Sequence, residues 1–453
     1  MGIYNAETAK KISDYIDQKR EEIIADIIRL VEIPSVSAPA VNEKPFGEGS
    51  YNALMEMLKI AKEHGMVTRN YENYCGGAWF EGSEDADIGF WGHLDVVPEG
   101  DNWIYEPYKA TLIDGYMIAR GASDNKGPTV ATMYAVQCLK DLGIPLKKKY
   151  KLFFGCDEEK GMEDVQYYAK NYPCPALCIT PDSSFPVKYA EKGILEVNLY
   201  SKPLTDSSAI TEFKAGLASN MVPNYAHAKA CGVSYNTVGA SAHTAYPYAG
   251  VNALVELLDK LLALDTLTAD ERAAFELYRV IVSDFNGIAA GIACKDDISG
   301  DMTCVGSMAD IENGRLMLHI NIRYPVRVPS DGIVAGLKAL SEKYSCDCFV
   351  KNDSKPNDFP ADHPIVTTIT AVCSDFEGKE MESSVMGGGT YARKLPKAFA
   401  CGMGLDKPED FKDFLPEGHG GAHAPDECLH IDTLLRGIKL FCRCLIEIDE
   451  LEI

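Results

Sequence analysis

Positive charge is scarce in this sequence relative to negative charge. The 453 residues include 44 lysine and arginine residues against 67 aspartate and glutamate residues, and the formal net charge at pH 7 is −23. Binding to nucleic acid or to an anionic membrane depends on Lys and Arg side chains that neutralise phosphate groups. We therefore expect neither nucleic acid nor a membrane surface as a partner.

Long apolar runs and paired cysteine motifs are also missing. No stretch approaches the ~18 consecutive apolar residues that predict a transmembrane helix. The first twenty residues carry scattered charges where a secretory signal would have an apolar block. The fifteen cysteines are scattered and form no Cys-x-x-Cys framework, which is typical of reduced thiols in a cytosol. The sequence thus predicts a cytoplasmic protein.

The order of apolar segments predicts two kinds of structure. Up to residue 189, short apolar strands alternate with longer helices, a pattern typical of a mostly parallel α/β sheet flanked by helices. Between residues 190 and 360, alternating strands surround one amphipathic helix expected over residues 251–265, which predicts an α+β domain. We therefore expect a discontinuous α/β domain of residues 1–189 and 361–453, interrupted by an inserted domain of residues 190–360.

Acidic and histidine side chains gather where strands of the first domain are expected to end. Each has a simpler alternative role, such as a helix N-cap for Asp124, a solvated loop for the acids at 157–159, or a turn for Asp182. Loops at the carboxyl ends of parallel strands lie at one edge of a sheet, so these side chains can converge on one pocket. The residues are His93, Asp95, Asp124, Asp157, Glu158, Glu159, Asp182 and His423.

Charge balance indicates what such a pocket would hold. Asp124, Glu159 and Asp182 supply three negative charges, and a bridging hydroxide would supply a fourth. Two divalent cations neutralise this set, and two metals that share a carboxylate and a water are a common hydrolytic arrangement. Glu158 is then left over and would serve as the general base.

A series of motifs supports this interpretation along nearly the whole chain. In order, they are GHLDVVPEGDNW, GASDNKGP, CDEEKG, TPDSSFP, ASNMVPN, GASAHTAYPYAGVNA, GGGTYARKLP and GAHAPDE. The series resembles that of the di-zinc aminoacylase/carboxypeptidase-type peptidase superfamily, and within it most closely the PepV-like cytosolic dipeptidases. The resemblance implies a zinc-peptidase-like catalytic domain, an inserted lid domain, and metal-dependent hydrolysis of the peptide bond of unblocked dipeptides.

The resemblance also implies a role for each metal-binding residue. His93 and Asp182 would hold one divalent ion, Glu159 and His423 would hold the other, and Asp124 would bridge them. Asp95 would orient His93. Glu158 would take a proton from the attacking water and pass it to the leaving amine.

Residues of the lid are implied to bind the substrate. His243 would donate a hydrogen bond to the developing oxyanion. Asn220 and Arg323 would hold the substrate carboxylate, assisted by the backbone amides of Gly387, Gly388 and Gly389. A lid within the same chain favours a monomer, because no partner subunit is then needed to complete the site.

Several alternatives remain open at this point. His419 competes with His423 as a ligand, and Arg327 competes with Arg323 as a carboxylate-binding residue. Zn²⁺ suits histidine and carboxylate ligands, but Mn²⁺ and Co²⁺ fit the same donors. The same metal chemistry would serve a deacylase that releases an acyl group from an N-acyl amino acid. A non-catalytic binding relative would be expected to lack a ligand or the base, and none is missing.

Overall fold

The computed structural model describes residues 3–405 and 414–453. The chain forms two compact units, which we call the first and the second unit. The first comprises Met1–Tyr189, Phe359–Ser384 and Thr390–Ile453, and the second comprises Ala190–Asp358 and Val385–Gly389. The short segment Val385–Gly389, which the sequence analysis grouped with the first domain, thus packs with the second unit.

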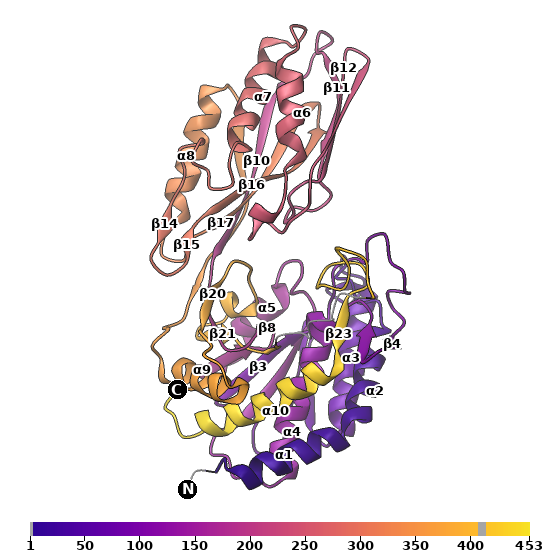
Figure 1. The fold of residues 1–453 in the computed structure, drawn as a ribbon, viewed down its shortest axis with the longest axis vertical. Coiled ribbons are helices and arrows are strands. Elements are labelled where there is room, and N and C mark those ends of the chain that lie inside the picture. The colour runs from indigo at the N-terminus through magenta and orange to yellow at the C-terminus, as the bar shows by residue number, and fades with distance from the viewer. Residues whose placement is uncertain (1–2, 406–413) are drawn as a thin grey trace. The chain divides into compact units, whose positions relative to one another are not determined.

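The first unit is built on a mixed sheet whose central strands are parallel (Figure 1). Within the first unit the strand order is β1-β2-β6-β3-β7-β21-β9. Strands β6, β3, β7 and β21 run parallel, whereas β1 and β2 add an antiparallel edge. These strands are β1 (Val67–Tyr71), β2 (Cys75–Trp79), β3 (Ile88–His93), β6 (Tyr150–Gly155), β7 (Leu177–Thr180), β9 (Lys188–Glu191) and β21 (Ala398–Ala400). The short strands β19 (Asn357–Asp358) and β20 (Ser384–Met386) lie where the chain passes from one unit to the other.

Both faces of this sheet are covered, which explains why its central strands are apolar at successive positions. Along β3, Phe90 belongs to the large core beneath one helical layer, and Trp91 packs on the other face against Phe153 and Tyr168. The larger layer consists of α1 (Ala6–Gln18), α2 (Arg20–Val31), α3 (Gly47–Glu63), α4 (Gly127–Asp141), α9 (Pro364–Glu377) and α10 (Ile431–Ile448). The opposite face carries α5 (Glu163–Asn171) and the short turn η3 (Tyr391–Lys394).

Smaller elements of the first unit shape its loops. They are the turn η1 (Ala122–Lys126), the three-stranded sheet of β4 (Thr111–Ile113), β5 (Tyr116–Ile118) and β23 (Cys428–His430), and the pair β8 (Ser183–Ser184) and β22 (Met403–Gly404). Strand β23 pairs with β5, so the C-terminal loop before β23 is joined to residues near position 118.

The second unit is an antiparallel sheet covered by helices on one face. The strand order is β13-β12-β11-β16-β17-β10-β18. Its core contains side chains from all three helices and from the strands. The elements are β10 (Gly193–Pro203), β11 (Ile210–Ala215), β12 (Tyr225–Ala230), β13 (Val233–Val238), η2 (Pro247–Ala249), α6 (Ala253–Leu262), α7 (Ala269–Ile281), β14 (Lys295–Asp296), β15 (Gly300–Asp301), β16 (Thr303–Glu312), β17 (Arg315–Tyr324), α8 (Ser330–Lys343) and β18 (Asp347–Ser354).

The predicted fold class is confirmed, because a mostly parallel α/β sheet flanked by helices is accompanied by a separate α+β unit. The expectation of one helix in the second unit was wrong. Helices α7 and α8 accompany α6, and together they bury the apolar face of the sheet. Among the described residues, no helix is long and apolar enough to span a membrane.

Candidate metal centre

The candidate site lies at the carboxyl ends of the parallel strands of the first unit. His93 is the last residue of β3, the acidic segment Asp157–Glu159 follows β6, and Asp182 follows β7. Asp124 lies in η1, immediately before α4, and His423 lies in the loop before β23. The topology therefore brings together residues that are up to 330 positions apart in the chain.

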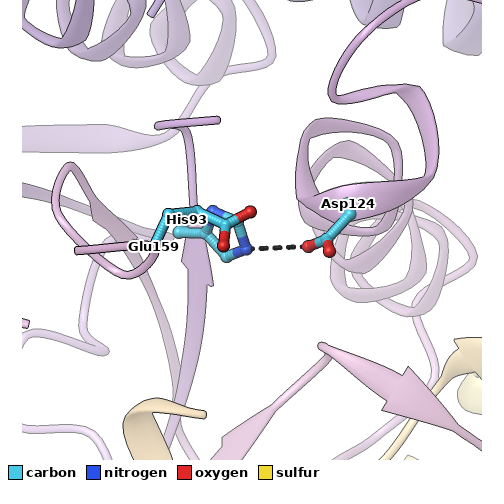
Figure 2. A group of neighbouring side chains, drawn as sticks. All are labelled: His93, Asp124 and Glu159. Atoms are coloured by element: carbon cyan, nitrogen blue, oxygen red, sulfur yellow. Dashed lines mark hydrogen bonds and ion pairs between the residues drawn. The ribbon is translucent and has the colours of Figure 1, made fainter. Parts of the chain in front are cut away.

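The side chains of the five predicted ligands lie close together. His93 Nε2 is 3.0 Å from Asp124 Oδ1 (Figure 2) and 3.8 Å from Asp182 Oδ1. His423 Nε2 is 3.1 Å from Asp124 Oδ2 and 3.0 Å from Glu159 Oε1. Each carboxylate oxygen of Asp124 thus faces a different histidine, which is the arrangement expected of a bridging ligand.

The donor set fits divalent cations. The ligand atoms of His93, Asp124 and Glu159 lie within 4.8 Å of one another, and so do those of His93, Glu158 and Asp182. Imidazole nitrogen and carboxylate oxygen are the donors that Zn²⁺ prefers in hydrolytic sites, and Mn²⁺ and Co²⁺ accept the same set. Two overlapping groups that share His93 are consistent with room for more than one ion.

The electrostatics of this cluster also favour added positive charge. Burial, together with the charge of Asp124, raises the pKa of Glu159 to about 7 and raises that of Asp182. Burial lowers the pKa of His423, but its contacts with Asp124 and Glu159 outweigh this effect and raise it to about 11. Protons bound by these groups supply the positive charge that a bound metal ion would otherwise supply. Metal affinity should therefore rise with pH, as these protons are released.

Glu158 differs from its neighbours in having a carboxylate oxygen without a partner. The residue is 9% exposed, and no group in the described chain forms a hydrogen bond with its buried Oε1. Burial raises the pKa of Glu158 well above the usual range. A buried carboxyl group beside the ligands, with one oxygen uncommitted, is what a proton-transfer group requires.

Asp95 contacts both His93 and the loop that carries Glu158. Its carboxylate accepts the backbone N–H groups of Glu158 and Glu159, at 3.1 and 3.0 Å. His93 Nδ1 lies 3.0 Å from the backbone carbonyl oxygen of Asp95 and 3.6 Å from its carboxylate Oδ1. Asp95 thus contacts His93 through its backbone and its side chain, and the same carboxylate holds the backbone of Glu158 and Glu159.

The alternative roles considered for the acidic residues do not fit the structure. Asp124 does not cap α4, since the N-cap position is Lys126 and no side chain caps that helix. Asp157 and Glu158 are buried and so do not form a solvated loop. His419, the rival of His423, pairs with Asp426.

One residue of this cluster was missed by the sequence analysis. Asn125 donates a hydrogen bond of 2.9 Å to Asp182. The only sign of this role in the sequence was its position next to Asp124.

A cavity of about 300 Å³ lies beside two of the predicted ligands in the first unit. Asp124 and Asp182 form part of its wall, and Ser183 lies next to them. Most of the remaining wall is apolar, with residues from β22, β23, the start of α10 and the adjacent loops. These residues include Met403, Leu405, Ala422, Cys428, Leu429 and Leu434.

Four of the predicted lid positions lie close together in the second unit, namely Asn220, His243, Arg323 and Gly387. The backbone carbonyl of Asn220 accepts the N–H of Thr244 at 2.9 Å, next to His243. Arg323 donates to the Thr244 hydroxyl at 3.3 Å and to the Gly387 carbonyl at 3.4 Å. Gly388 and Gly389 follow directly in the chain.

Arg323 and Arg327 lie in very different environments. Arg323 is buried, and Asn321 accepts its Nε–H at 2.9 Å. The side chain of Arg327 is 61% exposed and is paired with Asp358. The geometry therefore favours Arg323 over Arg327 as the residue that belongs to this cluster.

The choice between His423 and His419 can be tested by metal content. We expect His423→Ala to lose about one divalent ion per chain, because its Nε2 faces Asp124 and Glu159. His419→Ala should retain the wild-type content, because its ring faces Asp426 instead. Elemental analysis after gel filtration measures both. Equal metal loss in the two variants would contradict the assignment.

A family model matches most of the chain, and relatives and a solved structure resemble it over nearly its whole length. The sequence model of "Peptidase family M20/M25/M40" matches residues 89–447. A Bacillus subtilis protein named "Putative dipeptidase YtjP" is 33% identical, over 95% of this chain and 98% of its own length. The "Beta-Ala-Xaa dipeptidase" of Lactobacillus delbrueckii subsp. lactis is 29% identical, over 96% and 97%. The structure of human carnosine dipeptidase 1 covers 98% of this chain and 99% of its own, with a TM-score of 0.63 and 17% identity.

Proposed function

Because this chain belongs to peptidase family M20/M25/M40 and is a metallopeptidase of that family, we propose that it hydrolyses the peptide bond of unblocked dipeptides. The resemblance indicated by the motif series is confirmed by this membership. The observation that carries the proposal is the carboxylate of Asp124, whose two oxygens face two different histidines beside the buried, uncommitted oxygen of Glu158.

The proposed centre holds two divalent ions, with Zn²⁺ favoured by the donors. His93 and Asp182 would bind one ion, Glu159 and His423 the other, and Asp124 both. When bound, the ions would polarise the scissile carbonyl group and lower the pKa of the attacking water. Glu158 accepts a proton from that water and transfers it to the leaving amine, and Asp95 holds the backbone of Glu158 in place.

The second unit is proposed to bind the substrate. Arg323 and Asn220 bind the carboxylate of the C-terminal residue, and the amides of Gly387 to Gly389 assist. His243 donates a hydrogen bond to the oxyanion. Support comes from the hydrogen bond that its Nδ1 accepts from the Ala245 N–H, at 3.2 Å, since a neutral ring whose Nδ1 accepts carries its proton on Nε2.

The proposed substrate is short because a carboxylate clamp limits its length. A dipeptide presents its carboxylate one residue beyond the scissile bond, whereas a tripeptide presents it one residue further away. The cavity beside Asp124 and Asp182 offers space for the side chain of the N-terminal residue. We propose a monomer, because one chain supplies both clusters, and a cytosolic location, which the thiol form of all fifteen cysteines supports.

A deacylase remains the alternative, and a matched pair of substrates separates the two activities. Gly-Ala and N-acetyl-alanine differ only by the amino group. We expect kcat/KM for Gly-Ala to exceed that for N-acetyl-alanine by ~10²-fold or more, because curated relatives of this chain are dipeptidases. Release of free alanine, measured by chromatography, tests this.

The reverse preference would establish the deacylase and contradict the proposal. Ala-Ala-Ala serves as a second probe, and we expect it to be cleaved much more slowly than Ala-Ala. Equal rates for the two peptides would contradict the carboxylate clamp. Wild-type protein that is loaded with Zn²⁺, Mn²⁺ or Co²⁺ in turn would identify the ion that supports the highest rate.

A further inference from the structure

A buried carboxylate near the C-terminus forms hydrogen bonds with the loop that carries Asp124, the proposed bridging ligand. Glu427 lies four residues after His423 and is fully buried. Its Oε1 accepts hydrogen bonds from the Asp124 N–H at 2.9 Å, the Ser123 N–H at 2.8 Å and the Ser123 hydroxyl at 3.0 Å. Its Oε2 accepts the Gly121 N–H at 2.9 Å. This one side chain therefore accepts four hydrogen bonds from the segment of Gly121 to Asp124.

Arg120 connects the carboxylate of Glu427 to the backbone of His423. Its Nη1 pairs with Glu427 Oε2 at 2.9 Å, and both side chains are almost completely buried. Its Nη2 donates to the carbonyl oxygen of Glu99 at 3.1 Å and reaches the carbonyl oxygen of His423 at 3.5 Å. The ion pair thus connects the backbone of Asp124 to the backbone of His423, which lie about 300 residues apart in the chain.

The loop that carries His423 needs such support. His423 and Asp426 have φ angles of 62° and 51°, in the left-handed region that residues other than glycine rarely adopt. A backbone in this region persists only where its surroundings hold it. Groups that hold ligands in position without touching the metal commonly affect metal affinity by 10–100-fold.

We propose that Glu427 is a positioning residue of the metal centre, which sets the distance between the bridging carboxylate of Asp124 and the imidazole of His423. The inference rests on the proposed ligand roles of these two residues. A carboxylate is required because both of its oxygens accept only, whereas a glutamine would present an NH₂ group to two donors on one side.

Asp426 provides a matched control within the same loop. It is also fully buried, and its carboxylate accepts the backbone N–H groups of Ile104 and Tyr105, at 3.0 Å each, and faces His419. It therefore anchors the same loop to a different segment that carries no ligand. Asp426→Asn disturbs a buried carboxylate that binds backbone amides, but it leaves the turn of Asp124 intact.

The experiment compares Glu427→Gln with Asp426→Asn by Zn²⁺ titration against a chelator. In the wild type we expect two ions per chain. Glu427→Gln should weaken the binding of at least one ion by 10–100-fold, while Asp426→Asn should remain within about threefold of the wild type. Circular dichroism confirms that each variant is folded. Arg120→Lys keeps the buried charge but cannot reach both partners, and it should also weaken binding by about tenfold.

The outcomes separate this inference from the proposed function. A wild-type protein that binds fewer than two ions would contradict the proposed function itself. A wild type with two ions, together with a folded Glu427→Gln of unchanged affinity, would overturn only the positioning role. Equal weakening in Asp426→Asn would also overturn it, because the effect would then belong to the loop as a whole. If Glu427→Gln does not fold, unchanged affinity in Arg120→Lys overturns the inference.

Discussion

Glu158→Gln is expected to lower kcat for dipeptide hydrolysis by ~10²-fold or more, while the protein keeps its full metal content. Glutamine has nearly the same shape as glutamate but cannot accept a proton from the attacking water. Oε1 of Glu158 has no hydrogen-bond partner among the described residues, so the substitution breaks no bond at that atom. Steady-state kinetics on Ala-Ala and elemental analysis of the same sample measure the two quantities.

The neighbouring acid supplies the control for this prediction. Asp157 is buried to a similar degree, but its carboxylate accepts the Ser37 hydroxyl at 2.6 Å and the Glu163 N–H at 3.1 Å. Asp157→Asn should therefore keep kcat within about threefold of the wild type, at some cost in stability. A Glu158→Gln variant with wild-type kcat would refute the general-base role. Loss of metal from that variant would show that Glu158 is a ligand.

Much of the first unit could be predicted because its local signals agree with its tertiary structure. Strand β3 is apolar at successive positions and is buried on both faces, as expected of a central parallel strand. Helix α4 ends at Asp141, and Gly143 adopts a φ of 64° just beyond it, the left-handed conformation with which glycine commonly ends a helix. Here propensity, periodicity and burial all indicate the same structure.

The two missed helices of the second unit show where such signals fail. Helix α8 contains Gly332 and Gly336, which disfavour a helix in isolation, and it is stabilised by packing of Ile333 and Leu337 into the core. Helix α7 did carry a signal, since Thr268 and Glu271 form a capping box. Helix α8 was missed because it depends on tertiary packing. Helix α7 was missed because its capping box was overlooked.

The convergence of the candidate ligands could be predicted, because their residue types and their positions after successive strands indicate a shared pocket. The contacts that hold them could not. The carboxylate of Asp95 also accepts the backbone N–H groups of Glu158 and Glu159, which lie 63 and 64 positions later in the chain. Glu427 was visible in the GAHAPDE motif, but its partners at 120–124 are about 300 residues away, and sequence adjacency to His423 gives no indication of them.

The second prediction of large effect concerns His243. We expect His243→Ala to reduce kcat by 10²–10³-fold, the usual cost of removing one donor to an oxyanion. KM should change little, because a donor to the oxyanion acts mainly in the transition state. The Nδ1 of His243 accepts the Ala245 N–H, so the neutral ring presents Nε2–H as its donor. His243→Gln, which retains an N–H donor, should recover part of the lost rate.

His227 is the matched control in the same unit, because it is a histidine paired with Glu212 and Asn236 on the sheet. His227→Ala should leave kcat unchanged, which excludes a general effect of removing an imidazole from this unit. Metal content should equal that of the wild type in His243→Ala, His243→Gln and His227→Ala, since the ligands proposed for the ions lie in the first unit.

Two outcomes would contradict this role of His243. A fall in metal content for His243→Ala would contradict the oxyanion role and would make His243 a metal ligand. A rise in KM with unchanged kcat would assign it to ground-state binding of the substrate.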